Sequence, residues 1–182
     1  MKRRLPAKLA GAGLLLAFFA LPAGAQPALV AHAQLKDQQG KPVGSANLME
    51  TPGGLLIRLM ITDLKPGEHA IHIHAVGKCD PPFDSAGPHF NPGGHKHGML
   101  AGEGHAGDLP NLHVPDNGRL EVEMLTTKVT LEKGKPNSLF DADGSSLVIH
   151  AAADDYKSDP AGNSGARIAC GIIGSESTVG GR

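Results

Sequence analysis

The stretch Leu55-Leu56-Ile57-Arg58-Leu59-Met60-Ile61-Thr62 alternates between two kinds of position. Every odd-numbered position carries Leu or Ile, whereas the even-numbered positions include Arg58 and Thr62. Successive side chains of a β-strand point to opposite faces, so this pattern predicts a strand with one face in a hydrophobic core. The turn Pro52-Gly53-Gly54 marks where the strand begins.

The same alternation recurs on both sides of this stretch. It is seen at residues 29–36, at 120–124 after the turn Asp116-Asn117-Gly118, and at 147–151, and residues 168–173 form a final apolar run. No segment beyond the N-terminal region has a convincing helical pattern. Strand patterns separated by turns that contain Gly and Pro predict an all-β sandwich or barrel.

Two segments break this regularity and are expected to be long loops. Residues 75–119 are rich in Gly and Pro and have no period, and residues 151–166 are polar. A loop of this length in a compact domain is either functional or disordered. The first loop contains five of the ten histidines and most of the candidate metal ligands, which favours a functional role.

The N-terminus resembles an export signal. Lys2, Arg3, Arg4 and Lys8 precede the apolar run 9–21, and Ala23-Gly24-Ala25 is a small-residue cleavage site. We expect residues 1–25 to be a secretory signal peptide and residues 26–182 to form one domain, with 175–182 as a flexible tail. An uncleaved membrane anchor is the alternative. Export predicts a periplasmic or extracellular protein that is not bound to the membrane once the signal is removed.

The mature chain is acidic. The sequence contains 17 basic and 18 acidic residues, and removal of the four basic residues of the signal leaves a net charge of −5. This charge argues against nucleic acid as a partner. The only cysteines, Cys79 and Cys170, would meet an oxidising compartment, which favours a disulfide over free thiols or thiolate metal ligands.

Histidines are concentrated in the middle of the chain: seven of the ten lie between residues 69 and 105. His72 and His74 are two apart in a predicted strand, so they share a face and lie roughly 6.6 Å apart along it. His150 ends another predicted strand, and the loop supplies His89, His97, His105 and Asp108. Imidazole suits copper and zinc, and three His with one Asp suit a closed zinc site.

Several of these segments together resemble the copper-zinc superoxide dismutases, in their secreted bacterial branch. The segments that carry the resemblance, which spans nearly all of residues 26–182, are Gly67-Glu68-His69-Ala70-Ile71-His72-Ile73-His74, Gly87-Pro88-His89-Phe90-Asn91-Pro92, His105-Ala106-Gly107-Asp108-Leu109-Pro110 and Arg167-Ile168-Ala169-Cys170-Gly171-Ile172-Ile173-Gly174. The resemblance implies an eight-stranded Greek-key β-barrel or sandwich with two long functional loops.

The resemblance also implies a role for each site residue. It makes His72, His74, His89 and His150 the ligands of one copper, and His89, His97, His105 and Asp108 the ligands of one zinc. His89 would bridge the two metals. Asp154 would link a copper histidine to a zinc histidine, and Arg167 would orient the substrate. His95 competes with His97 for its place, and the Lys-His-Gly context favours His97. His32, His69 and His113 match no ligand.

The implied activity is the conversion of superoxide to dioxygen and hydrogen peroxide by copper cycling, with His89 letting go of copper on reduction and taking up a proton. This would be antioxidant defence outside the cytoplasm. A copper-storage or delivery protein and a zinc-only structural module are the alternatives. Because the chain is acidic, we expect a local positive patch to steer superoxide, with Arg167 in the site and Lys157, Lys96 or Lys78 at its rim. A homodimer is possible, and no pattern decides it.

Overall fold

The structure, a computed structural model, describes residues 29–175. The predicted signal 1–25 and residues 176–182 of the predicted tail lie outside the described residues. Ten strands and one 3₁₀ turn, η1 (Asp84–Ala86), make up its regular structure. Within residues 29–175 no helix is long and apolar enough to cross a membrane.

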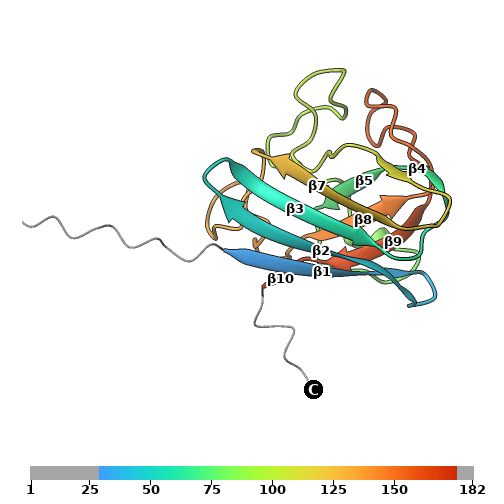
Figure 1. Cartoon of the computed structure of the whole chain (residues 1–182). Coiled ribbons are helices and arrows are strands. Elements are labelled where there is room, and N and C mark those ends of the chain that lie inside the picture. Colours follow the sequence, from blue (N-terminus) through green and yellow to red (C-terminus); the bar gives the residue numbers. More distant parts are fainter. Residues whose placement is uncertain (1–28, 176–182) are drawn as a thin grey trace, which may run out of the picture.

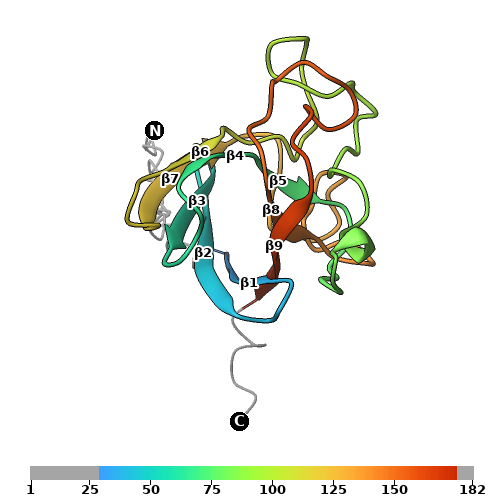
Figure 2. The ribbon, with the colours of Figure 1, turned by 90° about the vertical axis from the view of Figure 1, so that its right-hand side faces the viewer.

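Eight strands form one curled antiparallel sheet (Figures 1 and 2). They are β1 (Val30–Asp37), β2 (Pro42–Thr51), β3 (Gly54–Ile61), β5 (Ile71–His74), β7 (Leu120–Thr126), β8 (Ser146–His150), β9 (Arg167–Ile172) and β10 (Gly174–Ser175). The order is β5-β8-β9-β1-β2-β3-β7, with β10 paired to β1. β3 and β7 therefore lie at one end of the sheet, and β5 and β8 lie at the other. The chain crosses between the two ends from β3 to β5, from β5 to β7 and from β7 to β8, which gives the expected Greek-key type of connection.

A two-stranded sheet lies between the two edges of the curled sheet. It pairs β4 (Gly67–His69) with β6 (Leu112–Val114), and Figure 2 shows it spanning the open side of the curl. β6 lies in the segment 75–119 that we expected to be loop throughout. Three residues are too few to show a period in the sequence, and the strand exists because β4 pairs with it.

The hydrophobic core lies inside the curl. The inward-facing residues Leu55, Ile57 and Leu59 of β3 are fully buried, and Ile57 pairs with Leu48 on one side and Met124 on the other. The all-β prediction and the strand patterns are confirmed. β2 was not predicted, because its small and polar residues Gly44, Ser45 and Asn47 give only a weak strand signal.

All four residues of β5 are buried, which is unusual for a strand that alternates in polarity. Ile71 and Ile73 belong to the core, so His72 and His74 face the other way. The two long loops cover that second face, and both views show them side by side (Figures 1 and 2). A backbone hydrogen bond from Leu100 N to Tyr156 O, 3.1 Å long, joins them.

Candidate metal centre

Four buried histidines meet between β5, β8 and the first loop. His72 and His74 come from β5, His150 ends β8, and a β-bridge places His89 beside His74. Their ligand atoms all lie within 4.8 Å of one another. The strands are rigid and paired, so three of these four imidazoles are held by the sheet itself.

Hydrogen bonds from the outer ring nitrogens orient these imidazoles. His74 Nδ1 donates to Gly87 O (2.9 Å), His150 Nδ1 lies 3.3 Å from Gly165 O, and His72 Nε2 donates to Asp154 (2.8 Å). A nitrogen that donates on one side leaves the other nitrogen as a lone pair. His74 Nε2 and His150 Nε2 face each other at 3.4 Å.

Two further nitrogens are buried without a hydrogen-bond partner among residues 29–175. They are His72 Nδ1 and His89 Nε2, and both belong to this group of four. A buried polar atom without a partner is costly unless something absent from the protein chain completes it. Four imidazoles whose ligand atoms lie within 4.8 Å of one another form a nitrogen donor set that suits copper.

A second group of ligands lies on the other side of His89. It consists of His89, His97, His105 and Asp108. Asp108 Oδ1 lies 3.1 Å from His89 Nδ1, 3.0 Å from His97 Nδ1 and 3.5 Å from His105 Nδ1. Three nitrogens and one carboxylate oxygen are the donors of a closed zinc site. His89 offers Nδ1 to this group and Nε2 to the first.

Asp108 is held as an ionised carboxylate. Burial alone raises the pKa of a carboxyl group, but here hydrogen bonds from His89 and from the backbone N–H groups of Gly98 and His105 lower the pKa of Asp108 below its usual range. The two backbone bonds, 3.0 Å and 2.9 Å long, go to Oδ2. Oδ1 therefore remains free to face the three histidines.

Asp154 links the two groups, as the resemblance implied. Its carboxylate accepts hydrogen bonds from His72 Nε2 (2.8 Å) and His97 Nε2 (3.0 Å). Burial raises its pKa and these two bonds lower it, with a net pKa of about 2. Bonds of this kind fix the tautomer and orientation of a metal-binding histidine.

Two residues that the sequence did not point to hold Asp154 in place. The side chain of Asn111 forms two hydrogen bonds with the backbone of Asp154: Nδ2 donates to Asp154 O (2.9 Å), and Oδ1 accepts from Asp154 N (2.8 Å). Tyr156 donates its backbone N–H to Asp154 Oδ1 at 2.6 Å. Each is a single polar residue in an aperiodic loop, so no sequence pattern marks it.

Gly162→Ala is expected to disrupt the Asp154 bridge. A Cβ at Gly162 would collide with Asp154 Oδ1 and lie 2.7 Å from His97 Nε2, and Gly162 has a φ of +61°. Because outer hydrogen-bond partners of metal ligands contribute roughly 10–100-fold to affinity, zinc and copper affinities should fall by about that factor. Competition with a chelator measures both. Gly134→Ala, also at positive φ but with open space around it, is the control, and equal losses in the two variants would refute the argument.

The structure separates the two histidines that competed for one ligand position. His97 is fully buried, with Asp108 on one side and Asp154 on the other. His95 is exposed, and its Nε2 lies 3.3 Å from Glu103. We expect His97→Ala to lower zinc affinity by at least about 100-fold and His95→Ala by less than about threefold, because only His97 belongs to a group that could hold zinc. Zinc content after dialysis measures this, and equal losses would refute the choice of His97.

The remaining histidines lie outside both ligand groups. His69 is buried in the protein interior, with its two nitrogens 2.8 Å from His150 O and Lys65 O. His113 is exposed beside Glu68, and His32 lies 2.5 Å from Asn47 Oδ1.

Arg167 lines an open cavity of about 1010 Å³ that reaches His74, His89 and His150. Nη1 donates to Phe83 O (2.6 Å) and Nη2 to Gly87 O (2.8 Å), so the guanidinium is held over the loop that carries His89. The predicted disulfide between Cys79 and Cys170 is present and ties the same loop to β9, where Arg167 begins the strand.

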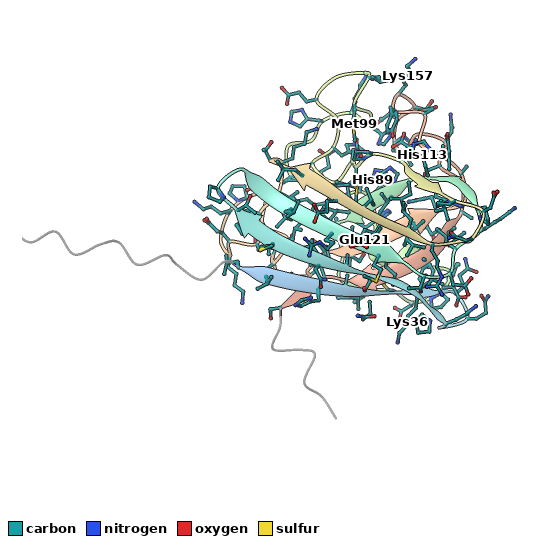
Figure 3. The ribbon with its side chains drawn as sticks, viewed as in Figure 1. Lys36, His89, Met99, His113, Glu121 and Lys157 are labelled. Carbon is teal, nitrogen blue, oxygen red and sulfur yellow. A yellow bond between two sulfur atoms is a disulfide. The ribbon has the colours of Figure 1, made fainter. Side chains whose placement is uncertain are left out.

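The structure does not bring Lys157, Lys96 or Lys78 to this cavity. Among the described residues that line it, Arg167 is the only cation. The backbone N–H of Lys157 donates to Asp155 Oδ1 in a tight turn, and Figure 3 shows Lys157 at the outer end of its loop, away from His89. A residue's position on a loop does not say which way the turn will direct its side chain.

The three strand histidines should make the metal-free protein sensitive to acid. Burial lowers the pKa of His72 to about 4, of His150 to about 3 and of His74 to about 2. As pH falls below about 6.5, the unfolded chain binds protons that the folded chain cannot, so the free energy of unfolding should drop by up to about 4 kcal/mol per pH unit. Urea titrations of metal-free protein between pH 7.5 and pH 4.5 test this. His150→Ala should reduce the slope by about one proton, and a flat profile would contradict the expected neutral histidines.

The two groups of candidate ligands share His89. One group has only nitrogen donors, and the other has three nitrogens and a carboxylate. Such an arrangement is typical of a protein with two adjacent metals. The sequence matches the copper/zinc superoxide dismutase family over residues 42–173. Two superoxide dismutases [Cu-Zn] of Aquifex aeolicus are similar. One is 55% identical over 80% of this chain and 88% of its own length. The other is 51% identical over 94% of this chain and 99% of its own length. The chain belongs to the copper/zinc superoxide dismutase family, and its activity is superoxide dismutation, an oxidoreductase reaction.

Solved structures agree with this assignment. A superoxide dismutase-like protein of Bacillus subtilis has a TM-score of 0.75 at 43% identity, covering 78% of this chain and 96% of its own. The Cu/Zn superoxide dismutase of Brucella abortus has a TM-score of 0.65 at 28% identity, covering 79% and 99%. The fold prediction is therefore confirmed by both the strand order and these relatives.

Proposed function

We propose that one copper binds to His72, His74, His89 and His150 and that one zinc binds to His89, His97, His105 and Asp108. The observation that carries this assignment is the pair of buried nitrogens without a partner, His72 Nδ1 and His89 Nε2, in the all-nitrogen group. The group completed by Asp108 has the charge and closed donor set of a structural zinc site. The residues present fit both metals.

Copper, when bound, supplies the one-electron exchange that turns two superoxide anions and two protons into dioxygen and hydrogen peroxide. Arg167 holds the anion in the cavity, because its guanidinium is planar, always charged and fixed by two backbone carbonyls. His89 Nε2 takes up a proton and donates it to the oxygen species that leaves as peroxide. His89 Nδ1 stays in the zinc group, so the ring keeps its orientation while Nε2 changes its proton.

Asp154 orients two of the histidines and takes no part in the reaction itself. It binds His72 and His97 at once, so a disturbance of one ligand group is transmitted to the other. The sequence of residues 1–25 and the Cys79–Cys170 disulfide both support export, and we propose that the enzyme removes superoxide in the periplasm or outside the cell.

The test is a superoxide assay paired with metal analysis on the same sample. Protein reconstituted with one copper and one zinc per chain should be active, and removal of copper alone should abolish the activity. A fully loaded protein without activity would overturn the proposed catalytic role and favour copper storage or delivery. Two zinc ions and no affinity for copper would favour a structural module.

A further inference from the structure

The mouth of the cavity is acidic. Four aspartates from three separate segments line it, namely Asp84, Asp141, Asp143 and Asp159, against the single guanidinium of Arg167. Asp84 lies on η1, the next two precede β8, and the last lies on the loop before β9. We call Asp141, Asp143 and Asp159 the acidic mouth.

These three carboxylates are not neutralised locally. Arg167, the one Lys or Arg side chain among residues 29–175 that lines the cavity, interacts electrostatically with the fourth aspartate, Asp84. Asp141 and Asp143 are exposed, and neither forms an ion pair within residues 29–175. Asp159 Oδ1 accepts the backbone N–H of His97 at 2.7 Å and lies 3.9 Å from His105 Nε2. The carboxylates therefore give the mouth a net negative charge.

The inner wall of the same cavity presents groups that bind a cation. His89 lines it, is only 5% exposed, and its Nε2 has no hydrogen-bond partner in the described part of the chain. His74 and His150 line it too, and both side chains are buried. Lone pairs inside and carboxylates outside attract a cation and repel an anion.

We propose that the acidic mouth collects the copper ion as a hydrated cation and delivers it to the all-nitrogen histidine group. The same field opposes the approach of superoxide, which is why anion capture depends on Arg167 alone. This inference rests on the copper assignment made under the proposed function. The rim of the cavity thus carries aspartates where we expected lysines, and its negative charge assists metal loading.

The experiment measures copper uptake rather than turnover. Zinc-loaded, copper-free protein is mixed with Cu(II) in a stopped-flow instrument, and the visible absorption of copper bound to imidazole is followed at several salt concentrations. For Asp141→Asn/Asp143→Asn we expect the second-order rate constant at low salt to fall by about threefold to tenfold. The difference should disappear near 1 M salt, where the Debye length is about 3 Å.

Asp116→Asn/Glu121→Gln is the matched control. It removes two negative charges outside the cavity, and Figure 3 shows Glu121 on the sheet. Its uptake rate should stay within about twofold of wild type. Both variants should bind one copper per chain at the end point. The backbone bond from Gly77 N to Asp143 O (2.8 Å) does not involve the substituted carboxylate.

Opposite effects on a cation and an anion distinguish the proposal from misfolding. At low salt the loaded Asp141→Asn/Asp143→Asn variant should turn over superoxide about twofold faster than wild type or more, although it takes up copper more slowly. Equal uptake rates, or equal slowing in the control, would overturn the acidic mouth. Loaded wild type without activity would overturn the proposed function and leave the uptake result standing, whereas wild type that takes up no copper would overturn both.

Discussion

We expect His150→Ala to lose copper and superoxide turnover and to keep zinc. The substitution removes one of four imidazoles from the all-nitrogen group but leaves the group proposed for zinc, to which His150 does not belong, intact. Residues that merely support a metal ligand contribute roughly 10–100-fold to affinity or activity, so loss of the ligand itself should lower activity by at least about 100-fold. Metal analysis and a superoxide assay on the same sample measure both effects.

The backbone contacts of His150 do not depend on its side chain. Its N–H donates to Ala70 O (2.9 Å), and its register with Arg167 on β9 is a main-chain feature that Ala keeps. His113→Ala, an exposed histidine outside both groups, is the control and should behave as wild type. Loss of zinc before copper from His150→Ala would mean that the two ligand groups are assigned the wrong way round.

The sequence predicts strands best where burial alone sets the pattern. Residues 55–62 became β3 because one face lies in the core and the other does not. β2 depends instead on its neighbours: a Cβ at Gly44 would lie 2.5 Å from Met60 O, so the close approach of β3 selects glycine there. A residue chosen for a contact 16 positions away in the chain cannot be recognised as part of a strand from its own segment.

The same limit applies to the site. The resemblance to the copper/zinc superoxide dismutases named every member of the two groups that the structure brings together, because histidine and aspartate carry the chemistry themselves. Which nitrogen each histidine offers could not be predicted, since it depends on partners such as Gly87 O, Gly165 O and Ser164 Oγ, which lie on loops without a pattern. The acidic mouth was missed for a related reason: its three carboxylates come from two loops that meet only in the folded chain.

Reduction of the Cys79–Cys170 disulfide should lower the melting temperature substantially. The bond closes a loop of 91 residues, for which the chain-entropy model gives about 4–5 kcal/mol of stabilisation. For a chain of this size that corresponds to a fall of about 8–20 °C. Calorimetry of the metal-loaded protein with and without reductant measures it, and Cys79→Ser/Cys170→Ser reproduces the reduced state without reductant.

Activity should fall with the disulfide even where the metals remain. The acceptors of the Arg167 guanidinium, Phe83 O and Gly87 O, belong to the segment that Cys79 ties to β9. Without the tie this segment can move away from Arg167, so the guanidinium loses its fixed position while the histidines on β5 and β8 keep theirs. We therefore expect reduced protein with full copper and zinc content to lose activity well below its melting temperature. An unchanged rate at full metal content would show that Arg167 is held by β9 alone, and an unchanged melting curve would show that the disulfide contributes nothing to stability.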